Sequence, residues 1–128
     1  MKRLLLDTHV LLWWLTDDPI LGEKAKAAIQ DIRNEVYVSA ASTWEISIKK
    51  SLGKLQVPDD MSTMIEDEGF IGLPISLYHG DQAGLLPKLH NDPFDRMLIA
   101  QAQAEGLILV THDAAIMQYT VQTLAASK

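Results

Sequence analysis

Apolar residues along this chain follow two patterns that alternate from one segment to the next. Short runs that are apolar at nearly every position are typical of strands buried on both faces. Segments in which apolar residues recur every three or four positions are typical of amphipathic helices. Segments rich in apolar residues, some with polar residues among them, predict strands at residues 2–6, 36–38, 70–75, 107–110 and 121–124. Gly72 and Pro74 indicate that the third of these lies at a sheet edge, and the last run is a second candidate for an edge strand.

The segments between these runs predict helices. They are expected at residues 10–15, 22–33, 42–52, 58–68, 77–86, 93–105 and 111–119. Ser42 and Glu45 have the spacing of a capping box, which predicts that the third helix begins at Ser42. A helix with this start is expected to bury the side chains of Trp44, Ile48 and Leu52. The helix at 22–33 is expected to bury one face made of Ala25, Ala28, Ile29 and Ile32.

Alternating strands and helices indicate a parallel sheet with helices on both faces. The predicted fold class is therefore α/β, a single domain over residues 1–128 built as an α/β/α sandwich around a mostly parallel sheet of about four to five strands. Ligands in such sheets bind beyond the carboxyl ends of the strands. Asp7 directly follows the first strand and Asp113 lies just beyond the strand at 107–110, so both should face that crevice.

The amino-acid composition limits which metal ligands and which binding partners are available. The 128 residues include no cysteine, so a bound metal must use oxygen or imidazole ligands. A net charge of −6 disfavours simple electrostatic adhesion to nucleic acid, although assigning four acids to a metal site leaves −2 for the remaining surface. The apolar run at 10–15 is too short to span a membrane. Asp7 and Asp17 interrupt the leader-like start, so we expect a cytoplasmic protein with no membrane partner.

Four carboxylates are candidates for chemistry, and each also has an ordinary structural explanation. Asp7 can bond nearby amides in a turn, Glu45 can cap a helix or pair with Lys49, and Asp113 can cap the helix that follows it. Asp95 can complement the dipole at the start of its helix, for which Asp92 is favoured as the capping residue.

The helical positions of two of these acids favour a joint site. Asp95 precedes Leu98 and Ala102 on one stripe, and Glu45 precedes Ile48 and Leu52 on another. A carboxylate at the head of an apolar stripe points toward the buried sheet, where an unpaired charge is costly. Several carboxylates meeting in one crevice make a hard, oxygen-rich site that suits Mg²⁺ or Mn²⁺.

Four segments resemble, in order, the motifs of VapC-type PIN domains. They lie at residues 4–9, 39–46, 92–100 and 111–113, and the most specific is Asp-Pro-Phe-Asp-Arg followed one residue later by Leu-Ile-Ala. The resemblance implies a PIN-like domain acting as a Mg²⁺- or Mn²⁺-dependent endoribonuclease, the toxin of a type II toxin-antitoxin pair. It also implies an RNA substrate, a homodimer and a cognate antitoxin. The family's metal-binding and catalytic acids carry over onto Asp7, Glu45, Asp95 and Asp113.

Several further residues are candidates for accessory or substrate-binding roles. They are Thr111, whose hydroxyl suits an accessory role, together with Thr8, His9, Arg96 and His112. Core packing or a subunit interface is favoured over base stacking for the three tryptophans. Trp13 and Trp14 are adjacent and diverge on a helix, so one of them is expected to be exposed for dimerisation.

Alternative functions are weighed on the same residues. A receiver-like phosphate-binding module usually has paired acids after its first strand and a lysine after its last, whereas Thr8 and His9 follow Asp7 here and no lysine occurs from Gly106 to Ser127. A haloacid-type phosphatase needs a second aspartate where His9 stands. A degenerate PIN domain, a DNA-directed or structure-specific nuclease, and a non-catalytic module with an acidic pocket stay open. The role of Glu45 also stays open: it is either a ligand of a second ion or the base that activates the attacking water.

Overall fold

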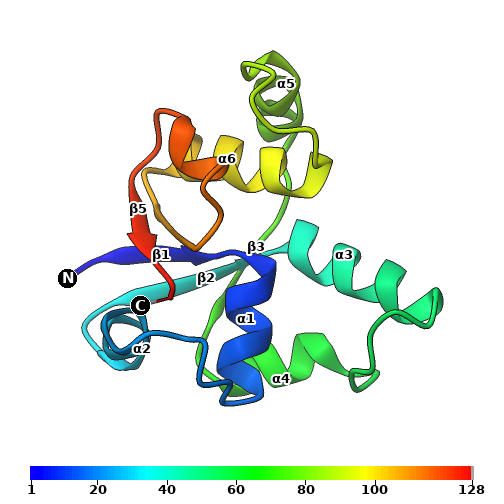
Figure 1. Cartoon of the computed structure of the whole chain (residues 1–128), viewed down its shortest axis with the longest axis vertical. Coiled ribbons are helices and arrows are strands. Elements are labelled where there is room, and N and C mark those ends of the chain that lie inside the picture. The colour runs from blue at the N-terminus through cyan, green and yellow to red at the C-terminus, as the bar shows by residue number, and fades with distance from the viewer. Residues whose placement is uncertain (128) are drawn as a thin grey trace.

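The computed structural model describes residues 1–127 and contains five strands and six α-helices (Figure 1). The strands are β1 (Arg3–Leu6), β2 (Glu35–Ser39), β3 (Ile71–Leu73), β4 (Ile108–Thr111) and β5 (Thr123–Ala125). The helices are α1 (Thr8–Leu15), α2 (Glu23–Gln30), α3 (Ala40–Ser51), α4 (Met61–Asp67), α5 (Leu77–Leu85) and α6 (Pro93–Glu105), with a short 3₁₀ turn at Ile116–Gln118.

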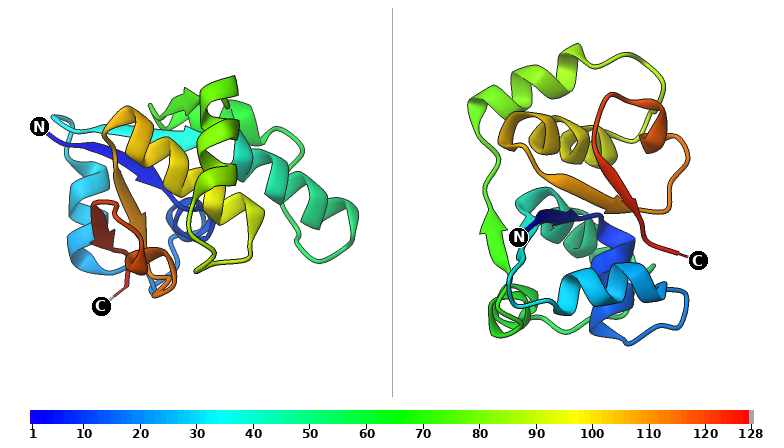
Figure 2. Two further views of the ribbon diagram at one scale, coloured as in Figure 1. Left: turned by 90° about the horizontal axis from the view of Figure 1, so that it is seen from above. Right: turned by 90° about the vertical axis from the view of Figure 1, so that its left-hand side faces the viewer.

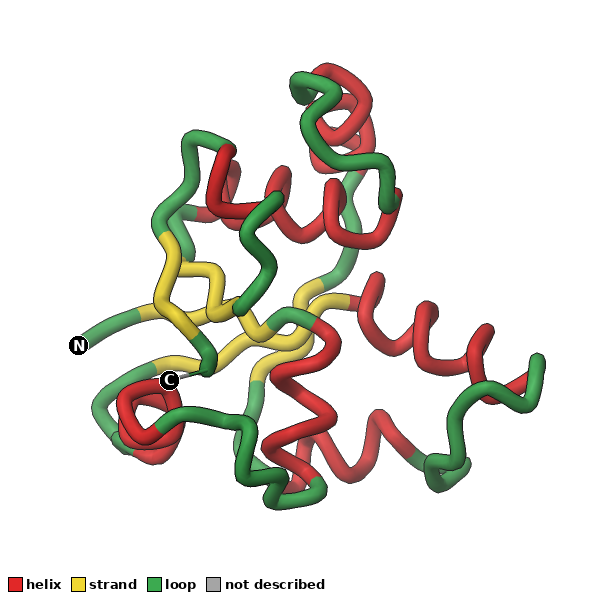
Figure 3. Tube along the Cα trace, in the orientation of Figure 1, coloured by secondary structure: helices red, strands yellow, loops and turns green. Residues whose placement is uncertain are grey.

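All five strands belong to one parallel sheet with the order β3-β2-β1-β4-β5 (Figure 3). The chain builds outward from β1 to β3 and then returns to place β4 on the other side of β1. Leu6 is paired with Val38 of β2 and with Val110 of β4. The strand order therefore reverses between β1 and β4, and this reversal is where sheets of this kind form a crevice for ligands.

Helices cover both faces of the sheet and enclose two hydrophobic clusters. Leu4 and Leu6 of β1 face a cluster that includes buried residues of α1, α2 and α4, while Leu5 faces a cluster dominated by α6. Figures 1 and 2 show α5 and α6 on one side and α1, α2 and α4 on the other. Successive strand residues point to opposite faces, which explains why the strand is apolar at every one of these positions. The predicted α/β/α sandwich is confirmed.

The edge positions are also confirmed, with small shifts of boundary. Strand β3 is shorter than the apolar run that predicts it and ends before Pro74, which cannot donate to a neighbouring strand. Strand β5 starts at Thr123, two positions later than expected. No helix within residues 1–127 is both long and apolar enough to cross a membrane.

The predicted start of α3 is wrong. The helix begins at Ala40, and Ser39 caps it by accepting a hydrogen bond from the Ala41 amide. Ser42 lies within the first turn, so Glu45 does not complete a capping box. The buried face then consists of Ala41, Ser42, Glu45 and Ile46. Two side chains expected to point inward are instead 60% and 62% exposed, those of Trp44 and Leu52.

Two further boundaries differ from expectation. Helix α2 ends at Gln30, which leaves Ile32 outside it and 98% exposed. Thr111 is the last residue of β4 and does not begin a helix. In the segment after it, only the 3₁₀ turn at Ile116–Gln118 is helical. Both errors lie at element ends, where polar side chains capping the backbone decide the boundary more than periodicity does.

Candidate active site

Asp7 lies between β1 and α1 and is buried. One carboxylate oxygen accepts the amides of His9 at 2.8 Å and Val10 at 3.3 Å, which caps α1. The other oxygen accepts the Thr111 hydroxyl at 2.7 Å. Three of about four acceptor positions on the carboxylate are thus occupied, and one stays available. The capping explanation holds for Asp7 and still leaves room for a ligand.

Thr111 joins the ends of β1 and β4. Its hydroxyl donates to Asp7 and accepts the amide of Asp113 at 3.1 Å. One oxygen of Asp113 accepts the Ala115 amide at 2.8 Å, so this aspartate also caps the turn that follows it. The hydrogen bonds place Asp7 and Asp113, which are more than a hundred residues apart in sequence, on two sides of one threonine.

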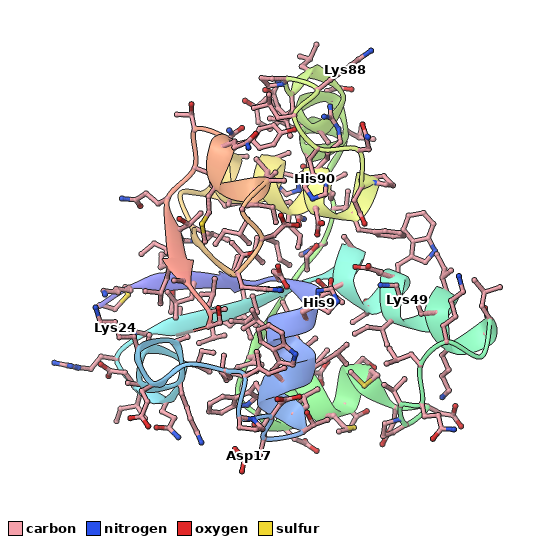
Figure 4. All side chains as sticks on the ribbon, viewed as in Figure 1. His9, Asp17, Lys24, Lys49, Lys88 and His90 are labelled. Atoms are coloured by element: carbon pink, nitrogen blue, oxygen red, sulfur yellow. The ribbon has the colours of Figure 1, made fainter. Side chains whose placement is uncertain are left out.

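Asp95 lies in the first turn of α6, where Asp92 is the capping residue and accepts the amides of Phe94 and Asp95. Its carboxylate meets His90 from the preceding loop, a histidine that Figure 4 labels. The His90 Nε2 atom lies 2.9 Å from Asp95 Oδ2 and 3.1 Å from Asp113 Oδ2. These three side chains form a group whose candidate ligand atoms all lie within 4.8 Å of one another.

The hydrogen bonds of His90 assign its tautomer. The Asp92 amide donates to Nδ1 at 3.3 Å, so Nδ1 carries a lone pair and the ring proton is on Nε2. Nε2 therefore donates to Asp113, and Asp95 Oδ2 lies 2.9 Å from the same nitrogen. A histidine that binds metal through Nε2 uses its other nitrogen as a donor, which is the reverse of this arrangement. In this arrangement His90 serves as a hydrogen-bond donor to Asp113 beside Asp95, and a role as metal ligand would require the other tautomer.

Glu45 projects from α3 and is 6% exposed. Its Oε2 atom accepts the ammonium of Lys49 at 2.9 Å, one helical turn away, as the sequence allowed. Its Oε1 atom is buried without a hydrogen-bond partner among residues 1–127. A buried carboxylate oxygen that nothing satisfies is costly, so this atom suits a cation, a water molecule or a proton.

The carboxylates influence one another electrostatically. Burial, followed by the charges of Asp92, Asp7 and Glu45, raises the pKa of Asp95 to about 7, although His90 opposes the shift. The pKa of Asp113 lies below its ordinary value. Burial acts to raise it, but hydrogen bonds from the Ala115 amide and His90 lower it by more. The site therefore carries more negative charge than its own basic groups balance.

Comparison with known proteins identifies the family of this chain. The family model described as PIN domain matches residues 4–121. The chain belongs to the PIN-domain family. This confirms the resemblance that the ordered motifs indicated, since the matched region contains all four acids.

Curated relatives of this PIN domain include two proteins of Mycobacterium tuberculosis. Ribonuclease VapC22 is 29% identical over 117 residues, which cover 88% of each chain. Ribonuclease VapC16 is 43% identical over 44 residues, and this match spans 34% of the present chain and only 31% of the relative.

Solved structures share the fold at lower identity. A toxin-antitoxin complex from Klebsiella pneumoniae contains a chain that matches with a TM-score of 0.68, 18% identity and 98% coverage of both chains. The VapBC2 structure from Rickettsia felis, bound to a promoter DNA fragment, matches with a TM-score of 0.68, 14% identity and coverage of 96% and 98%.

Two residues predicted to have accessory roles take part in contacts inside the PIN domain. The Thr8 hydroxyl is buried and donates to Ser42, which joins α1 to α3. The guanidinium of Arg96 donates to several groups of the segment before α6, namely the carbonyls of Ala83, Leu86, Pro87 and His90. These contacts account for both side chains without a substrate. The other two, His9 and His112, are exposed beside the acids.

His90 is the site residue that sequence reasoning missed. It lies in a loop and follows no strand, so neither periodicity nor strand-end position indicates it. The available signal was its place two residues before Asp92, which caps the helix that carries Asp95. Tyr119 was missed as well. Its hydroxyl accepts a hydrogen bond from the His90 amide at 2.8 Å, and the two residues are distant in sequence.

Proposed function

We propose that this PIN domain is a metal-dependent endoribonuclease that hydrolyses phosphodiester bonds of RNA and is the toxin of a VapBC-type pair. The observation that carries the proposal is the acidic site at the junction of β1 and β4. There Asp95 and Asp113 share His90, Thr111 connects Asp113 to Asp7, and the raised pKa of Asp95 reports the nearby charges of Asp7 and Glu45. The ribonuclease names of the curated relatives support RNA as the substrate.

The residues fit Mg²⁺ or Mn²⁺. Both ions prefer carboxylate oxygen and water ligands, and this site offers carboxylates from four elements with no thiolate. The unpartnered Glu45 Oε1 suits a cation, and a cation would offset the charges of Asp7 and Glu45 that, with burial, raise the pKa of Asp95. Asp7, Asp95 and Asp113 would hold the ion directly. Glu45 would either hold a second ion or act as the base.

A bound divalent cation makes an attacking water more acidic and stabilises charge on the phosphate and the departing oxygen. The protein supplies orientation. Thr111 fixes Asp7 by donating to Oδ2, and Asp92 fixes the first turn that carries Asp95. Lys49 occupies Glu45 Oε2 and leaves Oε1 available to accept the proton of the attacking water.

The test is cleavage of a labelled single-stranded RNA by purified protein with Mg²⁺ or Mn²⁺, compared with chelator and with Asp7→Asn. We expect cleavage to require the cation and to be abolished in Asp7→Asn. Asparagine is an equally good helix cap, so this variant should stay folded by circular dichroism. The matched control is Asp81→Asn on α5, an exposed position outside the site that should retain activity.

Metal-dependent cleavage that survives Asp7→Asn would contradict the assignment of the site. Cleavage of DNA in preference to RNA would replace RNA with a different substrate while keeping the chemistry. Absence of any cleavage by folded wild-type protein over a panel of transfer, ribosomal and messenger RNAs would favour an acidic module that only binds.

The proposal includes an antitoxin partner, a homodimer and action in the cytoplasm. Structural neighbours that were solved as toxin-antitoxin complexes support the partner. Exposed Trp44 on α3 and Leu77 on α5 offer apolar surface for a second copy. A small DNA-binding protein encoded immediately upstream, and a dimer mass by light scattering, are the expected observations.

A further inference from the structure

Three aromatic rings lie together beside the acidic site, on α1 and on the loop after β4. The Trp13 ring centroid is 4.8 Å from that of His112 and 6.2 Å from that of His9. The two histidine rings are 6.0 Å apart and nearly perpendicular. We name these three residues the aromatic platform. The spacing is that of rings in contact with one another.

The chain ties the aromatic platform to two of the proposed metal ligands. The His9 amide donates to Asp7, and His112 immediately precedes Asp113. Both histidine side chains are exposed and Trp13 is half-buried, so the rings present a surface to solvent. Figure 4 shows His9 and His90 on facing elements, α1 and the loop before α6. An unpaired base next to a phosphate in the acidic site would therefore meet these rings.

Core packing explains only part of this arrangement. Trp13 packs partly against the hydrophobic cluster, as does Trp14 beside it. Trp14 also satisfies its indole N–H by donating to Glu68, whereas no partner for the Trp13 N–H occurs within residues 1–127. The two histidines add no buried apolar surface. Their placement against Trp13 beside the acids is the feature that core packing leaves unexplained.

Charge indicates why a nuclease of this kind needs stacking. The chain has a net charge of −6. Its basic groups nearest the acids are engaged internally: Lys49 by Glu45, and Arg96 by backbone carbonyls. Attraction to phosphates is then weak, and RNA binding must draw on another source. Stacking on aromatic rings supplies such binding without positive charge and accepts any base.

We propose that His9, Trp13 and His112 stack against an unpaired base of single-stranded RNA next to the phosphate that is cut. This inference rests on the proposed ribonuclease function. It predicts that the enzyme requires single strands, loops or ends, because bases within a duplex do not expose a face for stacking.

The test measures binding of a fluorescent single-stranded RNA by anisotropy in chelator, where no cleavage occurs. We expect Trp13→Leu to weaken binding roughly tenfold and Trp13→Phe to recover most of the loss, because a phenyl ring also stacks. His112→Ala, at an exposed position, serves if Trp13→Leu is unstable. The matched control is Tyr78→Ala, which removes an exposed aromatic residue from α5. In cleavage assays, Trp13→Leu should raise KM with kcat little changed.

Unchanged RNA binding by Trp13→Leu and His112→Ala, with normal cleavage by wild type, would overturn the platform and leave the proposed function standing. Equal binding of duplex and single strand would overturn it as well. If the variants bind RNA normally but lose affinity for the antitoxin, the surface belongs to a protein partner and the platform is rejected. Failure of wild type to bind or cut any RNA would overturn both proposals.

Discussion

At the scale of single residues, Asp95 has the most informative chemistry. Its position on α6 is explained by the apolar stripe through Leu98 and Ala102, both of which are buried against the sheet. The same stripe holds the carboxylate near Asp7 and Glu45. Burial and like charges then raise its pKa to about 7, from an ordinary value of 3.8. The carboxyl thus keeps its proton to a higher pH in the folded protein than an ordinary aspartate does.

This shift predicts how stability depends on pH. Because the folded pKa lies above the unfolded one, the folded state keeps a proton that the unfolded state loses, so Asp95 destabilises the fold progressively as pH rises from about 4 to 7. Asp95→Asn should therefore be more stable than wild type at pH 8, by on the order of 2 kcal/mol after allowance for partial solvent exposure. The difference should vanish near pH 4.

Urea denaturation in chelator at both pH values measures this difference. Asp81→Asn, at an exposed position on α5, provides the matched control and should show no comparable gain at pH 8. A constant difference between Asp95→Asn and wild type at both values would show that Asp95 ionises as an ordinary aspartate.

At the scale of elements, the loop between α5 and α6 places His90, and Tyr119 holds that loop. The Tyr119 hydroxyl donates to the Pro87 carbonyl at 2.7 Å and accepts the amides of Leu89 and His90 at 3.1 and 2.8 Å. Arg96 donates to the same loop from α6. A segment without regular structure is thereby fixed by side chains from the elements on either side of it.

Tyr119→Phe should lower the free energy of unfolding by about 2 kcal/mol, because removing the hydroxyl leaves the His90 amide without its partner and takes one hydrogen bond each from the Leu89 amide and the Pro87 carbonyl. The measurement is equilibrium urea unfolding at neutral pH. Tyr78→Phe is the matched control, since that side chain is 58% exposed, and it should change stability by less than about 0.5 kcal/mol. Equal stability of the two variants would mean that the loop does not depend on Tyr119.

At the scale of the whole molecule, the proposed metal site should connect divalent cations to global stability. A cation that binds only the folded state stabilises it by about 2.7 kcal/mol at a hundred times its Kd. For a chain of 128 residues this raises Tm by roughly 10 °C. Scanning calorimetry with Mn²⁺ or Mg²⁺, against KCl of equal ionic strength, measures the increase.

Two variants separate the parts that Asp95 and His90 play in this response. Asp95→Asn should lose most of the increase in Tm, because it removes a ligand. His90→Ala should retain it, because His90 Nε2 donates to Asp113, lies 2.9 Å from Asp95, and so competes with the cation for these carboxylates. An increase lost in His90→Ala and retained in Asp95→Asn would reverse the two roles.

The fold class and the general position of the site could be predicted from sequence. Apolar runs such as residues 4–6 are typical of strands buried on both faces, and the helical segments between such runs indicate parallel crossovers. Asp7 follows one strand and Asp113 another, so both had to lie at the carboxyl edge of the sheet. The proline at the start of α6 and Asp92 before it likewise made the position of Asp95 predictable.

How these parts meet depends on contacts between segments that are distant in sequence. The hydrogen bond from Thr111 to Asp7 joins residues 104 positions apart, and it exists because β4 returns to the side of β1. The phase of α3 depended on contacts with α1, which a spacing of Ser42 and Glu45 could not indicate. His90 and the aromatic platform are set by loop ends brought together through strand order. Periodicity reports contacts within an element, whereas these contacts arise between elements that are distant in sequence.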